Sequence, residues 1–289
     1  MKETIGIVGL GFVGSAVFEG MKHAFNIAGY DKVKGAICSG GFTQEVKDLE
    51  SVVDCSVVVF VCVPTPMKSD GSCDTSIVEH VVNQIGEYCK NKNLHRVVVI
   101  KSTVVPGTTE RLNSFNQPSL SVCFNPEFLT ERNAINDFKN QDRIIIGGPF
   151  EGTAILKQVY ETAYPNVQVT KTSSTIAELV KYTTNCFLAV KVAVANEIQQ
   201  VCEKLNVDYD KVVEYATKDK RLGTSHWSVP GPDGKKGFGG SCFPKDINGF
   251  ISLAESLNVE CHTLSGAWQT NLEVRPDKDW EQLKGRAVV

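Results

Sequence analysis

A cysteine in a glycine-rich turn is the first feature of this 289-residue chain that could do chemistry. Cys242 lies in the segment Gly237–Asp246, just before an expected helix, with Pro244 near the first helical position. A thiol at a helix N-terminus beside a lysine, here Lys245, has a lowered pKa and more thiolate at neutral pH. We therefore expect Cys242 to be a nucleophile, and the other cysteines to be buried, inert residues.

A glycine motif near the N-terminus, Gly9–Gly14, follows one expected strand and opens an expected helix. Such glycines allow a tight turn and let a pyrophosphate approach the free N–H groups of the helix. Asp31 ends the next strand about 20 residues further on, where its carboxylate can accept hydrogen bonds from ribose hydroxyls. The same charge would repel a 2′-phosphate, which favours NAD over NADP, although Lys32 and Lys34 are adjacent. The expected cofactor contacts here are Gly9, Gly11, Phe12, Val13, Gly14 and Asp31.

Short β-rich runs alternate with helical stretches from Ile5 to about Thr170. This alternation is typical of a parallel sheet with helices on both faces, a doubly wound, Rossmann-like α/β fold. We expect an NAD-binding domain over residues 1–172. The expected strands are Ile5–Val8, Asn26–Tyr30, Ser56–Val63, Arg96–Ser102, Ser121–Phe124, Arg143–Ile146 and Val167–Thr170.

The composition then changes, because neither glycine nor proline occurs between Pro165 and Gly223. Apolar residues recur at helical spacing, which predicts one long helix from Thr175 to about Leu205, opened by a capping box of Thr175 and Glu178. A helix of that length usually packs against a partner, so residues 173–289 are expected to form an all-helical dimerisation domain.

Lys181 and Asn185 stand four residues apart in this expected helix, so both side chains can point at the same substrate oxygen. A cation and an amide aimed at a developing alkoxide can stabilise it by several kcal/mol in a site without water. The alternative is an ordinary exposed pair on a polar helix face.

Composition excludes several classes of protein. The formal net charge of −3 and the pI near 6.0 provide no basic surface for nucleic acid or an anionic membrane. No apolar run approaches the length of a membrane span, and the N-terminus lacks the features of a signal peptide. The ten cysteines show neither the pattern of a disulfide framework nor metal-ligand spacing, so we expect a protein of the reducing cytoplasm without a metal site.

The segment around Cys242 resembles the active-cysteine motif of the UDP-glucose/GDP-mannose dehydrogenase family, most closely its UDP-glucose branch. Further segments similar to motifs of that family occur in the expected order, as Val63–Pro66, Lys101–Val104, Asn125–Glu131 and Glu178–Asn185. The resemblance covers nearly the whole chain and is specific because it is an ordered set.

The resemblance implies a role for each residue on these motifs. The implied catalytic residues are Cys242 as nucleophile, Lys181 and Asn185 as oxyanion clamp, Asp246 to orient water or shuttle protons near Cys242, and Glu127 with a water held by Thr103 as general base. It adds cofactor contacts at Thr65, Thr103, Glu131 and Lys245, and substrate contacts at Glu127, Phe128, Leu129, Lys181, Asn185 and Gly239.

The implied reaction is a four-electron oxidation of a nucleotide sugar, with two NAD consumed for each sugar. A first oxidation of the C6 alcohol gives an aldehyde, which Cys242 traps as a thiohemiacetal; a second gives a thioester that water hydrolyses to the carboxylate. UDP-glucose is favoured over GDP-mannose and UDP-N-acetylmannosamine. The loop Gly223–Lys236, with His226, Trp227 and Asp233, is a further candidate for substrate contacts.

Family members usually carry a third domain that grips the nucleotide and supplies an arginine, and we expect it to be missing from this chain, which stops at Val289. A naturally short form, a fragment and help from a partner chain all remain open. Two alternatives for the function remain. One is a β-hydroxyacid dehydrogenase, which performs a single two-electron step, and the other is an inactive NAD-binding partner of a full-length enzyme. A homodimer is expected from the long helix and the family.

Overall fold

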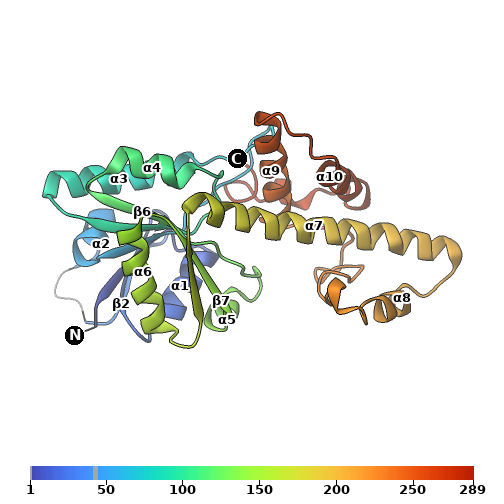
Figure 1. Ribbon diagram of the computed structural model, residues 1–289, viewed down its shortest axis with the longest axis horizontal. Helices are drawn as coiled ribbons and strands as arrows, with labels where there is room; N and C mark the ends of the chain where they lie inside the picture. The colour runs from blue at the N-terminus through green and yellow to red at the C-terminus, as the bar shows by residue number, and fades with distance from the viewer. Residues whose placement is uncertain (1, 42–44) are drawn as a thin grey trace. The chain divides into compact units, whose positions relative to one another are not determined.

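The computed structural model describes residues 2–41 and 45–289, and the chain divides into two compact units (Figure 1). Unit 1 comprises Met1–Thr65 and Thr75–Lys181, and unit 2 comprises Pro66–Asp74 and Tyr182–Val289. The division falls within one continuous helix, so that the predicted catalytic residues are shared between the units.

An eight-stranded sheet forms the centre of unit 1, in the order β3-β2-β1-β4-β5-β6-β7-β8. Strands β2, β1, β4, β5 and β6 pair in parallel, whereas β3 is antiparallel to β2 and β7 is antiparallel to β6. The strands are β1 Thr4–Val8, β2 Asn26–Asp31, β3 Gly35–Ser39, β4 Val58–Val61, β5 Arg96–Ile100, β6 Leu120–Phe124, β7 Arg143–Gly147 and β8 Gln168–Thr172.

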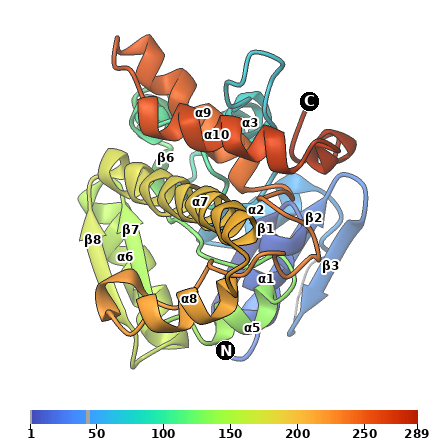
Figure 2. The same cartoon turned by 90° about the vertical axis from the view of Figure 1, so that its right-hand side faces the viewer.

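Helices cover both faces of this sheet because its central strands are apolar on both sides. In β4, Val58 and Phe60 face one core, which α1, α5 and α6 complete, while Val59 and Val61 face a second core built with α2, α3 and α4. Figures 1 and 2 show α6 lying against the sheet beside β7. The helices are α1 Phe12–Met21, α2 Leu49–Cys55, α3 Ser76–Lys92, α4 Thr108–Asn116, α5 Ala134–Lys139 and α6 Phe150–Ala163.

The structure confirms the doubly wound α/β fold, and all seven predicted strands are present. Two features of the sheet were not predicted. Strand β3 is an edge strand whose three central residues are exposed and whose two end residues are half-buried, so its sequence shows no alternation of buried and exposed positions. Strands β7 and β8, which pair in parallel with each other, run antiparallel to the five strands from β2 to β6 that pair in parallel, as β3 does, so the sheet is mixed and not wholly parallel.

Unit 2 is built around most of helix α7, Ser174–Leu205, the long helix that the sequence predicts. Tyr182, Cys186, Ala189 and Ala193 of α7 form a small core with residues of α9 and α10. Figures 1 and 2 show α9 and α10 on one side of α7 and α8 on the other. The remaining helices are α8 Tyr209–Ala216, η1 Lys220–Leu222, α9 Phe243–Ser256, α10 His262–Val274 and η2 Asp279–Gln282.

The predicted capping box at the start of α7 is wrong. The carboxylate of Glu178 is fully buried and accepts hydrogen bonds from the N–H groups of Gly107 and Thr109, at 2.6 and 2.9 Å, and from the Thr109 hydroxyl. These groups open α4, so Glu178 caps a helix distant in sequence instead of its own. Burial raises the pKa of Glu178, although the three donors partly offset this effect.

No helix within the described residues is both long enough and apolar enough to cross a membrane.

Candidate functional site

Four motifs of unit 1 meet at one edge of the sheet because each follows the carboxyl end of a parallel strand. Gly9 follows β1, Cys62 follows β4, Lys101 follows β5 and Asn125 follows β6. The order of the strands reverses at β1 and β4, since β2 lies outside β1 on one side and β5 beyond β4 on the other. In open α/β sheets ligands bind at this edge and at this switch point.

Each of the three motif positions is occupied by glycine for a different physical reason. Gly9 has a φ of +88°, and a Cβ there would lie 2.7 Å from the backbone oxygen of Cys62. A Cβ on Gly14 would lie 1.9 Å from the Gly9 oxygen, so close packing of α1 on the turn excludes any side chain. Gly11 has an ordinary φ of −67°, and a Cβ there would meet no protein atom within 4 Å. Neither the backbone nor packing requires this glycine, which fits close approach of a ligand at the N-terminus of α1.

Asp31 lies at the end of β2 and touches the glycine turn. Its Oδ2 accepts the Leu10 N–H at 2.8 Å, and its Oδ1 accepts the N–H groups of Val33 and Lys34 at 2.9 and 3.0 Å. Partial burial alone would raise the pKa of Asp31, but these hydrogen bonds and the Lys34 charge lower it. Asp31 is therefore ionised beside the motif, as a carboxylate that receives ribose hydroxyls must be.

Lys181 and Glu127 form a buried ion pair inside unit 1. The Lys181 Nζ lies 2.7 Å from the Glu127 Oε1 and donates also to the Glu127 backbone oxygen at 2.7 Å. The side chains are only 3% and 6% exposed, and the Leu129 N–H donates to the second carboxylate oxygen at 2.7 Å. Burial raises the pKa of Glu127, but Lys181 and the Leu129 N–H outweigh it, so the pKa lies below its ordinary value.

Lys101 is a residue of this site to which sequence reasoning assigned no role. Its side chain is buried, and its Nζ donates to the Asn125 Oδ1 at 2.8 Å and lies 5.5 Å from the centre of the Phe138 ring. The Tyr160 hydroxyl donates to the same Asn125 oxygen. Within the described residues, Lys101 has no carboxylate partner at ion-pair distance. Burial lowers the pKa of Lys101 to about 8, with Lys181 acting in the same direction and Cys62 and Glu127 opposing it.

A cavity of about 500 Å³ opens beside these groups within unit 1. Its wall includes Lys101, Glu127, Phe128, Leu129 and Arg143, and the Arg143 guanidinium lies 4.5 Å from the centre of the Phe128 ring. The predicted substrate contacts Phe128 and Leu129 therefore line a hollow that is large enough for a sugar-sized group.

Cys242 is the residue directly before α9, with Phe243 and Pro244 in its first turn, as the sequence predicts. The Asp246 N–H donates to the Cys242 backbone oxygen at 2.9 Å, which closes the first turn of the helix. The Ser241 Oγ lies 3.9 Å from the Cys242 sulfur. The thiol is thus set at a helix N-terminus, where unpaired N–H groups favour negative charge.

The second cluster of predicted catalytic residues surrounds Asp246, whose carboxylate is 1% exposed. The Asn185 Nδ2 donates to the Asp246 Oδ2 at 2.6 Å, and the Lys245 Nζ pairs with the Asp246 Oδ1. Burial lowers the pKa of Lys245, but the neighbouring Asp246 and the thiols of Cys242 and Cys73 outweigh it and raise that pKa. Lys245 thus lies against Asp246 in the structure, where the resemblance expected a cofactor contact.

The remaining predicted site residues lie in loops that follow β4, β5 and β6 or precede α9. Thr65 and Thr103 are buried where the chain leaves β4 and β5, and Glu131 is exposed beyond the loop that follows β6. Gly239 lies in the turn before Cys242. In unit 2, therefore, the structure brings together Asn185, Asp246 and Lys245, and in unit 1 it brings together Lys181 and Glu127.

Trp227 and Asp233 of the loop Gly223–Lys236 form contacts with other residues of the chain. The Trp227 Nε1 donates to the Gly223 oxygen at 3.0 Å, and the Lys191 Nζ lies 5.0 Å from the centre of the Trp227 ring. Asp233 forms an ion pair with Arg275 at 2.6 Å. Across residues 2–41 and 45–289, no group of His, Cys, Asp and Glu side chains is arranged to hold a metal ion.

Comparison with known proteins gives two family matches in chain order. Residues 25–164 match the NAD binding domain of the UDP-glucose/GDP-mannose dehydrogenase family, and residues 175–273 match its central domain. The UDP-glucose 6-dehydrogenase of Rickettsia bellii is 36% identical over 237 residues, which cover 80% of this chain and 51% of that protein. The chain spans about half the length of the curated relatives it matches.

Solved structures agree with this result. A UDP-glucose dehydrogenase from Pyrobaculum islandicum superposes with a TM-score of 0.83 at 31% identity, over 94% of this chain and 68% of that one. A 3-hydroxyisobutyrate dehydrogenase from Mycobacterium tuberculosis superposes with a TM-score of 0.74 over 96% of this chain and 95% of that one, but at 17% identity it shows a shared fold only. The ordered motifs, the two domain matches and the structural likeness together show that this chain belongs to the UDP-glucose/GDP-mannose dehydrogenase family.

Proposed function

We propose that this chain is an NAD-dependent nucleotide-sugar dehydrogenase that oxidises a sugar CH2OH group to a carboxylate through a covalent intermediate on Cys242, with UDP-glucose as the preferred substrate. The observation that carries the proposal is the pair of buried charge clusters, Lys181 with Glu127 and Asn185 with Asp246. Lys181 and Asn185 stand one turn apart on α7. Buried charges without a functional reason are rare because removing them from water is costly.

The residues at the edge of the sheet fit the cofactor. The open position at Gly11 and the N-terminus of α1 would receive the pyrophosphate of NAD, and ionised Asp31 would receive the ribose hydroxyls. When bound there, NAD would supply the hydride acceptor for both oxidations.

Lys181 and Asn185 would stabilise the oxygen that becomes negative as carbon is oxidised. Glu127 holds the Lys181 ammonium by two hydrogen bonds, so that the amine is oriented before substrate arrives. Preorganised donors cost no reorganisation during the reaction, which makes them effective in a site from which water is excluded.

Cys242 would attack the aldehyde carbon as a thiolate, forming a C–S bond in a thiohemiacetal while the carbonyl oxygen takes a proton. Loss of hydride from that carbon, together with loss of the proton from its hydroxyl group, leaves a thioester. Water then breaks the C–S bond and releases the acid and the thiol. This order explains the need for a nucleophile, because a free aldehyde would escape before its second oxidation.

Glu127 and Asp246 would serve proton transfer. The lowered pKa of Glu127 keeps it ionised at neutral pH, so it can accept a proton from the attacking water, which Thr103 would help to hold. Asp246, one turn into α9 from Cys242 and paired with Lys245, would move a proton near the thiol.

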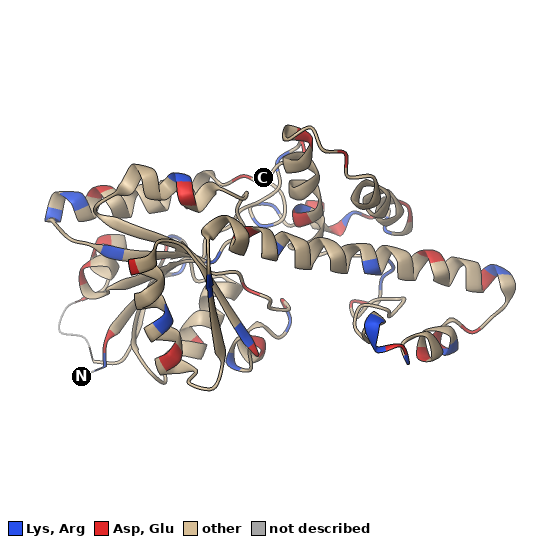
Figure 3. Cartoon of the chain, viewed as in Figure 1, with Lys and Arg blue, Asp and Glu red and all other residues tan. Residues whose placement is uncertain are grey.

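A homodimer is part of the proposal. Phe187, Val194, Ile198, Val201 and Leu205 are exposed and follow one another at spacings of seven, four, three and four residues, which places them along one stripe of α7. Figure 3 shows few charged residues in the middle of this helix. An exposed apolar stripe with this spacing is typical of a helix that packs against a second copy.

The experiment that tests the proposal uses the purified chain with NAD and a panel of nucleotide sugars. We expect NADH from UDP-glucose, and less from GDP-mannose or UDP-N-acetylmannosamine. If a two-electron carbonyl product accumulates with one NADH per substrate, the β-hydroxyacid type of reaction is correct instead. If no sugar yields NADH but NAD still binds, the chain is a binding partner of another enzyme. The proposed location is the cytoplasm, where NAD and nucleotide sugars are both available.

A further inference from the structure

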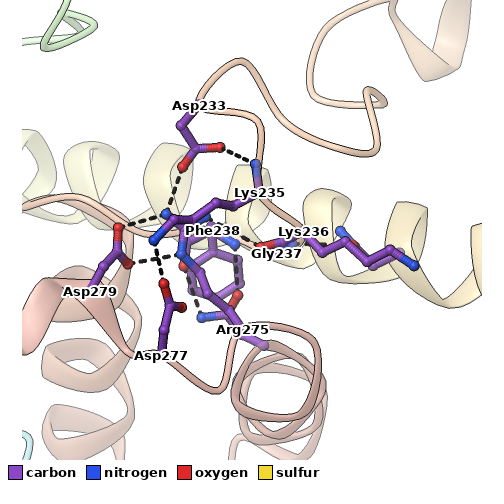
Figure 4. Close-up of polar contacts among 10 residues, drawn as sticks. Asp233, Lys235, Lys236, Gly237, Phe238, Arg275, Asp277 and Asp279 are labelled. Atoms are coloured by element: carbon purple, nitrogen blue, oxygen red, sulfur yellow. Dashed lines mark hydrogen bonds and ion pairs between the residues drawn. The ribbon is translucent and has the colours of Figure 1, made fainter.

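Arg275, the residue that follows α10, is a buried cation to which neither the motifs nor the family comparison gives a role. Its side chain is 2% exposed and lies between two carboxylates (Figure 4). The Arg275 Nε and Nη2 donate to the two oxygens of Asp279 at 2.8 and 2.7 Å, and Nη2 donates also to the Asp233 Oδ2 at 2.6 Å. Burial lowers the pKa of Arg275, but the two aspartates outweigh it and raise that pKa. Arg275, Asp233 and Asp279 together form an arginine triad.

The arginine triad lies directly against the turn that leads to Cys242. A Cβ added to Gly239 would lie 2.4 Å from the Arg275 Nη2 and 2.6 Å from the Asp279 Oδ1, so the guanidinium occupies the space of a side chain. The Arg275 Nη1 also donates to the Lys236 backbone oxygen at 3.3 Å. Gly239 precedes Cys242 by three residues, so the arginine triad contacts the backbone close to the proposed nucleophile.

Neutral hydrogen bonds fix the backbone next to this contact. The fully buried Asn271 accepts from the Phe238 N–H at 2.7 Å and donates to the Phe238 oxygen at 2.9 Å. Asn196 accepts from the Gly237 N–H at 3.1 Å. Residues 237 and 238 are thus held from α7 and α10. Figure 4 shows Gly237 and Phe238 beside Arg275. The arginine triad then fixes the segments on either side of them.

Stability alone gives no good reason for a buried arginine paired at this position with two aspartates that are 32% and 28% exposed. A buried ion pair is often no more stabilising than well-packed apolar residues of the same volume, because desolvation offsets the attraction between the charges. What a planar guanidinium adds is geometry, since its fork fixes two carboxylates in defined directions. Arg275 uses that fork to join the turn at Asp233 to η2 at Asp279, with Gly239 between them.

We propose that Arg275, with Asp233 and Asp279, is a positioning residue for Cys242: the arginine triad holds the glycine turn so that the thiol is kept at the N-terminus of α9. The turn is clamped before Cys242 by the triad, and the chain is closed after it by the Asp246 N–H bond to the Cys242 oxygen. The triad does not contact the reacting atoms. This inference rests on the proposed role of Cys242 as nucleophile.

The test compares the wild-type protein with Asp233→Asn and Arg275→Lys. Asp233→Asn keeps the shape but removes one charge, and Arg275→Lys keeps the charge but removes the fork. The matched control is Asp277→Asn, which breaks the exposed ion pair of Lys235 and Asp277 in the same cluster (Figure 4). For each protein the alkylation of Cys242 by iodoacetamide is followed against pH by peptide mass spectrometry, together with kcat, KM and the melting temperature.

If the turn is released, the thiol leaves its place at the helix N-terminus and its thiolate loses stabilisation. We expect the pH midpoint of Cys242 alkylation to rise in both variants, and kcat to fall about tenfold or more with little change in KM for NAD. The alkylation of Cys261, in the same unit, is expected to be unchanged, and so is every property of Asp277→Asn.

A lower melting temperature with an unchanged alkylation profile and unchanged kcat would overturn the proposal and leave the arginine triad a purely structural element. If Arg275→Lys does not fold, Asp233→Asn decides, because its carboxylate is one-third exposed and the other ion pair of the triad remains. Alkylation needs no substrate, so it reports on positioning even if the wild-type chain makes no NADH from UDP-glucose. A wild-type chain that makes no NADH from UDP-glucose would contradict the proposed function, but not the positioning role of the arginine triad.

Discussion

Replacing Lys101 with methionine is expected to stabilise unit 1 at neutral pH. Lys101 is buried, its hydrogen-bond partner is the neutral Asn125, and its pKa falls from 10.5 to about 8. A lowered lysine pKa means that the folded state disfavours the proton, so the charged form destabilises the fold. A shift of this size corresponds to about 3 kcal/mol, since one pKa unit is about 1.4 kcal/mol. Loss of the hydrogen bond to Asn125 subtracts about 1 kcal/mol, which leaves a net gain of about 2 kcal/mol.

The pH dependence gives the sharper test. Below pH about 8 Lys101 is charged in both the folded and the unfolded chain, so the destabilisation is present in full. Between pH about 8 and 10.5 the folded chain releases the proton first, and the destabilisation disappears as pH rises. The advantage of Lys101→Met should therefore be largest at neutral pH and shrink through this window. Methionine matches the unbranched stem of lysine up to the fourth side-chain atom, so the packing of the stem is retained while the charged Nζ is removed.

Urea unfolding followed by circular dichroism at several pH values measures this difference directly. The chain has two units, so hydrogen exchange of peptides from β5 is added to report on unit 1 itself. Lys90→Met, at an exposed position of α3, is the matched control and should show no such pH dependence. If Lys101→Met is equal to or less stable than wild type at neutral pH, or if the difference does not change with pH, the reading of Lys101 as an unpaired buried charge is refuted.

Three further predictions follow from the site. Cys242→Ser is expected to stop at an aldehyde-level species, and uronate production at the wild-type rate, measured by mass spectrometry, would remove the nucleophile assignment. Gly11→Ala should keep the wild-type melting temperature but weaken NAD binding in calorimetry, because its Cβ meets no protein atom, whereas Gly14→Ala should destabilise unit 1 because its Cβ would lie 1.9 Å from the Gly9 oxygen. Equal effects of the two alanines on stability would contradict this assignment of the turn. Phe187→Glu places a charge on the exposed apolar stripe of α7 and should shift the chain to a monomer in analytical ultracentrifugation; an unchanged sedimentation coefficient would argue against dimerisation through this face.

The central strands, α7 and the helix after Cys242 were predictable because the forces that form them are visible in the local sequence. Buried strands are apolar throughout, a long helix needs a stretch without glycine or proline, and Pro244 marks the first turn of α9. Strand β3 was missed because an exposed edge strand needs no core-facing pattern. The residues Lys32 and Lys34, considered for their charge alone, belong to the turn between β2 and β3, where the Lys34 N–H binds Asp31.

Partners distant in sequence were not predictable. Glu178 resembles a local cap in sequence, but its acceptors are satisfied by groups about 70 residues away at the start of α4. Lys101 carries a charge in the sequence, and only the fold reveals that it is buried beside Asn125, with no carboxylate at ion-pair distance among the described residues. The hydrogen bond of Arg275 to Asp233 was likewise not predictable, because Asp233 lies 42 residues earlier in the sequence. The roles assigned to Cys242 and the other site residues stay predictions.

The most direct test of the proposed chemistry is the number of NADH molecules formed for each UDP-glucose consumed. The wild-type protein is incubated with limiting UDP-glucose and excess NAD, NADH is followed by absorbance, and the sugar product is quantified by mass spectrometry. Oxidation through a Cys242 thioester predicts two NADH for each sugar and UDP-glucuronate as the product. One NADH for each sugar, with a stable aldehyde or ketone as the product, would contradict it.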